Sequence, residues 1–475
     1  MSDVAFSQLP LPPAQLANLE RLGYREMTPI QAAALPLALA GQDLIAQAKT
    51  GSGKTAAFAL PLLCKLNPRD FGAQALVLCP TRELATQVAA EIRRLARYQA
   101  NIKLLTLCGG QSIGPQIGSL EHGAHVIVGT PGRIRDHLRK QTLSLARVNT
   151  LVLDEADRML EMGFLEDISQ IIEATPGNRQ TLLFSATYPE DIQQLSRRFQ
   201  SSAAQKIQVA SQHSAQQINQ AFFICQHGTK REALLQLIAH YQPEQAVIFC
   251  NTREAVREVS RVLSEVHGAT LALYGDLEQR ERDQVLVQFR QRSARLLVAT
   301  DVAARGLDID DLPVVINFDL PRDAEQYVHR IGRTGRAGKS GQALSLFTDR
   351  ERYRLDAIAE YQAREVGFDA VQSLQPTDAR LPPPAFVTLA IAAGRRNKIR
   401  PGDILGALTR AGGIDGKAVG RIDVLDFAAY VAVERGKARH ALRQLQEGKI
   451  KGRKFKVRQL RFALPSEERR LQPLR

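Results

Sequence analysis

Short runs of apolar residues alternate with longer stretches of mixed polarity through the first 205 residues. Clear examples of the short runs are 76–78, 126–128, 151–153 and 182–184. Short apolar runs bounded by polar residues are typical of buried strands, and the stretches between them have the length of helices. The alternation predicts an α/β domain over 1–205, with a parallel sheet covered by helices.

The same alternation returns after a polar connector at 200–217 that is rich in Ser and Gln. Apolar runs at 246–249, 296–299 and 314–318 predict a second α/β domain over about 220–365. The next segment, 366–384, turns polar and ends in Leu-Pro-Pro-Pro. This composition predicts a stiff, extended linker.

A third module is expected over about 385–465. Its predicted elements are a strand, a helix, two strands, a helix and a strand, at 386–391, 401–410, 420–433, 436–447 and 454–460. The order βαββαβ predicts a small α+β domain.

Positive charge is concentrated in this third module. The chain of 475 residues has 63 Lys and Arg against 49 Asp and Glu, a net charge of +14. Residues 381–475 hold 21 of the basic and 8 of the acidic residues, or +13, which leaves 42 against 41, or +1, for the first 380. A basic tail predicts a polyanionic partner, although a solvated basic surface explains the charge alone equally well.

The cysteines are odd in number and lack the spacing of metal ligands; they are Cys64, Cys79, Cys108, Cys225 and Cys250. We expect buried, reduced thiols. The N-terminus lacks the pattern of a secretion signal, and no apolar run approaches the roughly 20 residues of a membrane span. These features predict a cytoplasmic protein that does not enter a membrane.

A glycine-rich segment follows the apolar run 44–46 and precedes a helix-like stretch at 56–62. It matches the phosphate-binding loop pattern, with alanine in place of the first glycine, over Ala48, Lys49, Thr50, Gly51, Ser52, Gly53, Lys54 and Thr55. Backbone N–H groups of such a loop converge on phosphate oxygens at a helix N-terminus. We expect Lys54 to reach the β- and γ-phosphates and Thr55 to hold Mg²⁺. A turn without a ligand is the alternative, which the Gly-Lys-Thr ending disfavours.

Two carboxylates follow the apolar run 151–153. Asp154 is expected to position Mg²⁺, and Glu155 to orient and deprotonate the attacking water. Alone, such a pair more often begins a helix or lies in a solvated turn. The phosphate-binding loop upstream favours the catalytic interpretation.

The tetrapeptide Asp-Glu-Ala-Asp at 154–157 spells the signature of the DEAD-box ATP-dependent RNA helicases. The chain resembles this family over about 6–348. The resemblance implies two tandem RecA-like domains, ATP and Mg²⁺ as cofactors, and RNA as the substrate.

Residues 23–31 resemble the Q motif of the same family. The resemblance implies that Gln31 reads the adenine edge, with Tyr24 and Phe6 helping to hold the base.

Other family motifs occur in the family's order. Ser185 and Thr187 lie in a segment that resembles the one coupling hydrolysis to strand separation. The octapeptide that ends at Arg336 resembles the arginine-finger motif, so Arg333 and Arg336 are expected to stabilise the transition-state charge. The resemblance also implies that Asp308 contacts the ribose.

Several short loops resemble the family segments that hold the RNA backbone. Loops with Gly, Thr and Arg suit phosphate and 2′-OH contacts because backbone N–H groups can approach closely and no base is read. The candidates are Pro80, Arg82, Gly110, Thr130, Gly132 and Arg133 in the first domain, and Thr252, Arg253, Gly275, Gln279, Arg282 and Thr300 in the second.

The third module resembles the RNA-recognition (RRM-like) domain of bacterial DEAD-box helicases of ribosome assembly, most clearly at 400–408 and 448–452. The resemblance implies a hairpin of 23S rRNA in pre-50S particles as the partner, and it leaves the oligomeric state open. Residues 426–433 lose a basic and an aromatic position of the usual signature but keep Tyr430. We therefore expect RNA contacts from Tyr430 and from three basic side chains, Lys454, Lys456 and Arg458.

Two alternatives remain at this point. A DNA helicase or translocase shares the phosphate-binding loop and the paired carboxylates, and ATPase stimulation by RNA against DNA separates it. A non-enzymatic RNA chaperone with a decayed core would bind through the tail alone, and an RNA-stimulated ATPase assay separates it. The intact Lys54, Glu155, Arg333 and Arg336 argue against decay.

Overall fold

The computed structural model describes residues 5–48, 52–188, 190–208, 218–304, 312–335, 340–375, 380–410 and 412–460. The chain divides into two compact units, Met1–Gln212 and His213–Arg475.

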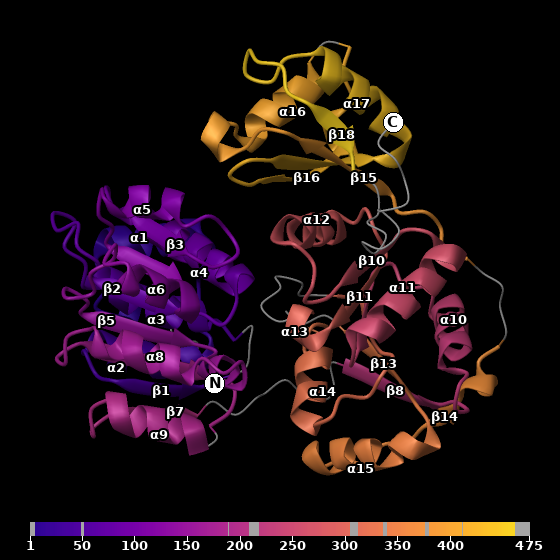
Figure 1. Ribbon diagram of the computed structural model, residues 1–475, viewed down its shortest axis with the longest axis horizontal. Helices are drawn as coiled ribbons and strands as arrows, with labels where there is room; N and C mark the ends of the chain where they lie inside the picture. The colour runs from indigo at the N-terminus through magenta and orange to yellow at the C-terminus, as the bar shows by residue number, and fades with distance from the viewer. Residues whose placement is uncertain are drawn as a thin grey trace. The chain divides into compact units, whose positions relative to one another are not determined.

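The described residues of the first unit form a seven-stranded parallel sheet with the strand order β3-β4-β2-β5-β6-β1-β7 (Figure 1). Its strands are β1 (Leu44–Gln47), β2 (Ala75–Leu78), β3 (Leu104–Leu107), β4 (Val126–Gly129), β5 (Thr150–Asp154), β6 (Gln180–Ser185) and β7 (Gln205–Gln208). Its helices are α1 (Pro13–Arg21), α2 (Pro29–Leu39), α3 (Lys54–Cys64), α4 (Arg82–Leu95), α5 (Gly114–Leu120), α6 (Pro131–Arg139), α7 (Ala156–Glu161), α8 (Leu165–Glu173) and α9 (Glu190–Phe199).

This sheet is buried on both faces because its central strands are continuously apolar. Val77 and Val152 belong to the core on one face, together with residues of α2, α3 and α4. Leu76 and Leu151, their neighbours in sequence, belong to the core on the other face, with residues of α6, α7, α8 and α9. Successive side chains of a strand point to opposite faces of the sheet, so neighbouring residues belong to two separate cores.

A second parallel sheet of seven strands has the order β10-β11-β9-β12-β13-β8-β14, which is the order of the first sheet shifted by seven. Its strands are β8 (Ile218–Ile224), β9 (Ala246–Cys250), β10 (Thr270–Leu273), β11 (Leu296–Thr300), β12 (Val314–Asn317), β13 (Gly341–Phe347) and β14 (Asp369–Ala370). The helices of this part are α10 (Lys230–Tyr241), α11 (Arg253–His267), α12 (Gln279–Arg290), α13 (Asp301–Ala304), α14 (Ala324–Ile331) and α15 (Arg352–Tyr361). The predicted pair of RecA-like α/β sheets is confirmed.

The second unit also contains a four-stranded antiparallel sheet with the order β16-β17-β15-β18. Its elements are β15 (Phe386–Ile391), α16 (Pro401–Thr409), β16 (Val419–Val424), β17 (Ala429–Glu434), α17 (Ala438–Glu447) and β18 (Val457–Gln459). Both helices pack on one face of this sheet, against alternate residues such as Leu389 and Val431. The predicted βαββαβ order is confirmed, although the last strand is shorter than the predicted 454–460.

The segment 366–384, predicted to be a stiff, extended linker, is partly anchored to the second parallel sheet. Asp369–Ala370 pairs with β8 as an edge strand, and the side chains of Val371, Leu374 and Leu381 are buried in the core of that sheet. Composition could not reveal this, because a few widely spaced apolar residues are enough to anchor a polar segment to a neighbouring core.

Four of the five cysteines are buried, as expected, but Cys64 is exposed. It lies in the last turn of α3, where its Sγ contacts the Gln15 side chain at 3.3 Å. The expectation of burial was wrong here because the apolar run before Cys64 does not show that the helix ends at the surface.

Among the described residues, no helix has the length and apolar character needed to cross a bilayer.

Candidate nucleotide and nucleic-acid sites

The order of the first sheet brings the predicted nucleotide residues to one edge. β1 pairs with β6, and β6 pairs with β5, all in parallel. The carboxyl ends of parallel strands lie on the same side of a sheet, where α/β proteins bind their ligands. The phosphate-binding loop after β1, Ser185 at the end of β6 and Asp154 at the end of β5 are therefore neighbours.

The described part of the phosphate-binding loop is shaped by a glycine. Gly53 has φ of 91°, and a Cβ on this residue would lie 2.6 Å from Nε2 of Gln31. Lys54 begins α3, is buried, and donates from Nζ to the carbonyl of Ala48 at 3.0 Å. Thr55 lies half-buried in the same first turn. Ser52 is also described, whereas Lys49, Thr50 and Gly51 lie outside the described residues.

The Q motif contacts the phosphate-binding loop directly. The Gln31 Nε2 donates to the carbonyl of Gly53 at 3.0 Å, and its Oε1 accepts from the backbone N–H of Thr28 at 2.9 Å. The Tyr24 hydroxyl donates to Glu91 at 2.5 Å, and the ring of Phe6 lies edge-on to Tyr24 at 6.0 Å between centroids. Both ends of the Gln31 amide are thus engaged by protein, and its contact with adenine stays a prediction.

Asp154 has the properties of a cation ligand. The residue is only 3% exposed, and its Oδ1 is buried without a hydrogen-bond partner in the described part of the chain. Burial is the main reason that the pKa of this carboxyl is raised to about 6. The positive charge of Lys54 lowers the pKa, and the negative charge of Glu155 raises it. A buried carboxylate oxygen without a donor is stabilised by a bound cation, so this residue fits a Mg²⁺ site.

Glu155 adopts an unusual backbone conformation. Its φ of 54° and ψ of 52° lie in the left-handed region, which costs a residue with a side chain about 1–3 kcal/mol. The carboxylate is buried and forms an ion pair with Arg158 at 3.4 Å. Backbone strain held beside a phosphate-binding loop is typical of a functional position.

Asp157 was missed as a site residue, although it is the last letter of the signature at 154–157. Its Oδ2 accepts from the N–H groups of Ala186 and Thr187, at 3.0 and 2.9 Å, and from the Thr187 hydroxyl at 3.1 Å. The Ser185 hydroxyl accepts from the Asp157 N–H at 3.3 Å. Burial acts to raise the pKa of Asp157, but the Thr187 N–H and Lys54 lower it below its ordinary value. The carboxylate therefore ties the signature to the predicted coupling segment.

The predicted RNA residues of the first unit follow three neighbouring strands. β4 pairs with both β2 and β3, so Pro80, Gly110 and Thr130 come after adjacent strand ends. Gly110 has φ of 68°, and a Cβ there would lie 2.4 Å from Nη1 of Arg82. The positive φ favours glycine at this position, and the Arg82 side chain lies beside it.

Arg133 is oriented by a residue that the sequence did not indicate. The Arg133 Nη1 donates to Oε1 of Gln116 at 3.0 Å, and its Nη2 donates to the carbonyl of Gln111 at 2.8 Å. Gln116 is buried and also donates to the carbonyl of Cys108 at 3.1 Å. Gly132 lies beside Arg133 in the first turn of α6.

The second sheet repeats this arrangement, because β11 pairs with both β9 and β10. Thr252, Gly275 and Thr300 therefore lie at three adjacent strand ends. Among the polar candidates next to them, Arg253 pairs with both oxygens of Asp276, at 2.7 and 2.9 Å. Gln279 and Arg282 lie in the first turn of α12.

Two described arginines of the arginine motif differ in their surroundings: Arg330 holds other side chains of the second unit, and Arg333 is the candidate arginine finger. Arg330 is 1% exposed and donates to both oxygens of Asp301 at 2.7 Å and to Asn251 at 2.8 Å. Arg333 is 8% exposed and lies just beyond α14. Arg336 and Asp308 lie outside the described residues.

The Tyr430 side chain is buried, contrary to its expected role. It was expected to contact RNA, but its side chain is 3% exposed and packs against Val287 and Leu460. The Gln291 Nε2 donates to the Tyr430 carbonyl at 3.2 Å and to the Asp423 carboxylate at 2.9 Å. α12 and the residues after it cover this face of the antiparallel sheet, so the Tyr430 ring presents no stacking surface.

The three basic tail candidates, in contrast, are exposed. Arg458 lies in β18, and Lys454 and Lys456 precede that strand. Their availability agrees with the proposed role in RNA binding.

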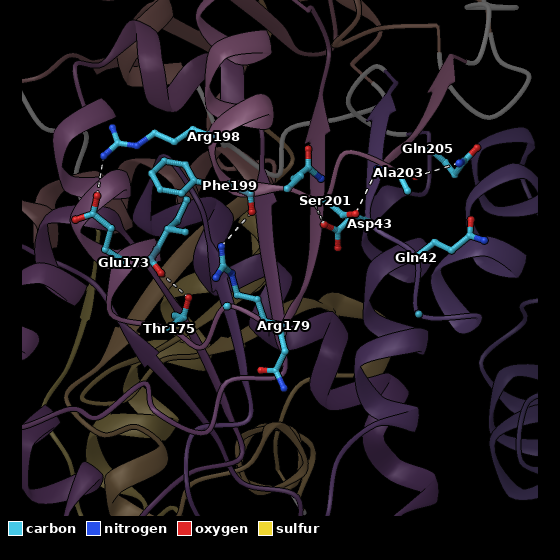
Figure 2. Close-up of a pocket in the computed structure, with 15 residues that line it drawn as sticks. Gln42, Asp43, Glu173, Thr175, Arg179, Arg198, Phe199, Ser201, Ala203 and Gln205 are labelled. Carbon is cyan, nitrogen blue, oxygen red and sulfur yellow. Dashed lines mark hydrogen bonds and ion pairs between the residues drawn. The ribbon is translucent and has the colours of Figure 1, made fainter.

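A cavity of about 750 Å³ lies at the opposite edge of the first sheet, among the loops before β1, β6 and β7. Figure 2 shows the Arg198 guanidinium pointing toward the Glu173 carboxylate, with which it pairs at 2.7 Å, and the Asp43 carboxylate beside Ser201, from whose backbone N–H it accepts at 2.8 Å. Arg179 donates to the carbonyl of Phe199 at 3.1 Å. None of the predicted site residues is among the described residues that line it, and its contacts hold three loops together.

Three family models match the chain. The DEAD/DEAH box helicase model matches 28–195, the helicase conserved C-terminal domain model matches 229–338, and the DbpA RNA binding domain model matches 388–459. These ranges fall on the first parallel sheet, the second parallel sheet and the antiparallel sheet.

Curated relatives and a solved structure are similar over the same parts. The chain is 52% identical over 461 residues to the ATP-dependent RNA helicase DbpA of Escherichia coli (strain K12), covering 96% of this chain and 100% of that protein. It is 43% identical to the DEAD-box ATP-dependent RNA helicase CshA of Bacillus subtilis (strain 168), covering 76% of this chain and 73% of that protein. The structure of S. cerevisiae Dbp5 bound to RNA and ADP BeF3 is similar with a TM-score of 0.70 and 30% identity, over 78% of this chain and 100% of that chain.

Proposed function

This chain belongs to the DEAD-box ATP-dependent RNA helicases and carries a C-terminal DbpA RNA-binding domain, and from this premise we propose that it unwinds duplexes locally in 23S rRNA during assembly of the large ribosomal subunit. The observation that supports the target best is the match of 388–459 to the DbpA RNA binding domain. Contacts to RNA backbone carry no sequence information, so a separate domain has to direct the enzyme to one site. The proposed partner is an rRNA hairpin near the peptidyl-transferase centre in pre-50S particles.

The proposed catalytic roles follow from the buried edge of the first sheet. Lys54 binds the β- and γ-phosphates of ATP, and Glu155 accepts a proton from the attacking water. Asp157, in the same signature, holds Ser185 and Thr187 of the coupling segment through its hydrogen bonds. Arg333 and Arg336 of the second unit stabilise the charge that develops on the γ-phosphoryl group.

Thr55 and Asp154 are the proposed ligands of Mg²⁺. The Oδ1 of Asp154, buried without a hydrogen-bond donor, supports this assignment. When bound, the ion supplies positive charge to the phosphate oxygens. Thr55, in the first turn of α3, and Asp154, at the end of β5, would hold the ion.

Gln31, Tyr24, Phe6 and Asp308 are the proposed contacts to the adenosine part of ATP. The RNA backbone is proposed to follow the loops after β2, β3 and β4 in the first unit and after β9, β10 and β11 in the second. A cytoplasmic location, expected from the sequence, remains a prediction.

The target is tested by ATP turnover with three nucleic acids of equal length: an rRNA fragment with the peptidyl-transferase hairpin, an unrelated RNA and a DNA of the same sequence. We expect the rRNA fragment to stimulate turnover at the lowest concentration. Equal stimulation by the two RNAs would contradict the rRNA target. The variant with Lys454, Lys456 and Arg458 changed to Glu should lose the preference, because charge repulsion replaces three phosphate contacts.

Lys54→Ala should lower ATP turnover roughly 10²- to 10³-fold, the usual loss when one donor to a developing charge is removed. RNA binding in the absence of ATP should be unchanged, since Lys54 donates to the Ala48 carbonyl and is not among the residues proposed to contact RNA. Turnover and RNA affinity are measured on the same preparation, with Lys65→Ala as a control at the other end of α3. Turnover at the unmodified rate would contradict the phosphate-binding assignment.

A further inference from the structure

Among the described residues, the two central strands of the antiparallel sheet, β15 and β17, are covered on both faces. Its helix-facing side is occupied by α16 and α17. On its other side, the Thr388 hydroxyl donates to Oε1 of Gln291 at 3.0 Å and lies 2.7 Å from the Ser293 hydroxyl. Thr388, Gln291 and Tyr430 are all at most 3% exposed. A base of the target RNA therefore has to bind this domain elsewhere than over the two central strands of the sheet.

Three loops of the domain form one continuous surface, here called the basic loop surface: 394–400, 425–428 and 448–456. The N–H groups of Arg395 and Arg396 donate to the carbonyls of Leu425 and Asp426, at 2.8 and 3.1 Å, which joins the first two loops. The Lys451 Nζ donates to the carbonyl of Lys398 at 2.8 Å, which joins the third loop to the first.

The basic loop surface has an extreme charge. Its cationic residues are Arg395, Arg396, Lys398, Arg400, Lys449, Lys451, Arg453, Lys454 and Lys456, and its one carboxylate is Asp426. All nine cationic residues are exposed. Such a density of cations suits a path of RNA phosphates and releases counterions when RNA binds.

An aromatic ring lies in the middle of these charges. Phe427, at the turn between β16 and β17, is 67% exposed, more than any other large apolar residue whose exposure is described. The guanidinium of Arg396 lies over its ring, 4.5 Å from the centroid, and Arg395 lies 3.9 Å from the carboxylate of Asp426. These contacts fix the turn from one side and leave most of the ring open to solvent.

We propose that Phe427 is a stacking platform for an unpaired base of the target RNA, with the Arg396 guanidinium and the lysines of the basic loop surface holding the phosphates on either side. The proposal rests on the RNA target proposed above and assigns its contact site. Aromatic faces and arginine planes are the usual partners of splayed bases in hairpin loops, where a duplex offers no free base face. The surface thus distinguishes a hairpin loop from a plain duplex.

The test measures affinity of the full chain, without ATP, for two labelled RNAs that share the same base pairs: a stem–loop and a blunt duplex. Phe427→Ala should weaken binding of the stem–loop roughly 5- to 150-fold, the range for loss of one stacked base. Affinity for the duplex should change little. Phe427→Tyr keeps the ring and should restore stem–loop affinity.

Tyr353→Ala is the matched control, because Tyr353 is 63% exposed and has the Arg354 guanidinium 5.6 Å from its ring centroid, yet lies outside the basic loop surface. It should bind both RNAs as the unmodified chain does. Replacing Lys451 and Arg453 with Ala should weaken the binding of both RNAs. The slope of log K against log salt concentration should fall by about one for each residue replaced.

Two outcomes would overturn the proposal. Unchanged stem–loop affinity in Phe427→Ala would mean that the ring does not contact RNA. An acidic protein would then be the expected partner of the surface. Equal weakening of stem–loop and duplex means that no base is stacked. Either outcome is distinct from failure of the rRNA target, which the turnover preference of the unmodified chain reports separately.

Discussion

Glu155→Gln should lower ATP turnover roughly 10²- to 10⁴-fold while ATP and RNA still bind, because general base catalysis contributes about that factor. The amide can still donate and accept hydrogen bonds to water, but it cannot take up the proton that the attacking water loses. Release of phosphate in a single turnover and affinity for RNA with ATP present are measured together. We expect a complex with RNA that persists, since hydrolysis no longer ends it.

Glu161→Gln is the control for this experiment. It makes the same chemical change in the same short helix, α7, at an exposed position near its other end. Its turnover should equal that of the unmodified chain. A normal rate in Glu155→Gln would place the general base at another residue.

Loss of the base should also leave the coupling segment in place. The hydrogen bonds to Ala186 and Thr187 come from Asp157, not from Glu155. Asp157 holds the residues that follow β6, whereas Glu155 is the proposed general base. We therefore expect the two acidic residues of the signature to have separate roles.

The sequence predicted the strand, turn and helix around the phosphate-binding loop well because its signals are local. A strand, a glycine-rich turn and a helix in direct succession leave one geometry, and Gly53 and Lys54 lie as that geometry requires. The two RecA-like sheets were also predicted from local signals, because continuously apolar strands have to be covered by helices on both faces.

Residues whose surroundings come from distant parts of the chain were predicted poorly. Tyr430 belongs to a strand with the expected alternation, but alternation cannot show that α12 covers the face opposite the domain's own helices. Gln116 and Asp157 organise their neighbours through side-chain hydrogen bonds across 17 to 30 positions, which no local pattern displays. Phe427 is the one aromatic residue in a short turn, and only its exposed fraction distinguishes it from a core residue.

Arg333→Ala should have the largest effect on RNA-stimulated turnover, a loss of roughly 10³- to 10⁵-fold, which is the contribution of an arginine finger to phosphoryl transfer. Charge spreads over the γ-phosphoryl oxygens only in the transition state, so the lost cation should affect kcat far more than ATP affinity. Both are measured with saturating RNA, and ATP affinity is measured again without RNA. Arg350→Ala removes an exposed arginine of the same unit and should turn over normally.

Arg333 can be separated from a structural arginine by a stability measurement. Arg333 is 8% exposed, whereas Arg330, three residues earlier, holds Asp301 and Asn251 from a fully buried position. Removing the Arg330 side chain would leave a carboxylate unpaired, so its loss of activity would come with a lower denaturation midpoint. Arg333→Ala should lose turnover at temperatures at which the variant remains folded, because its proposed partner is the nucleotide. A small change in kcat in the folded variant would mean that Arg333 does not complete the ATPase site.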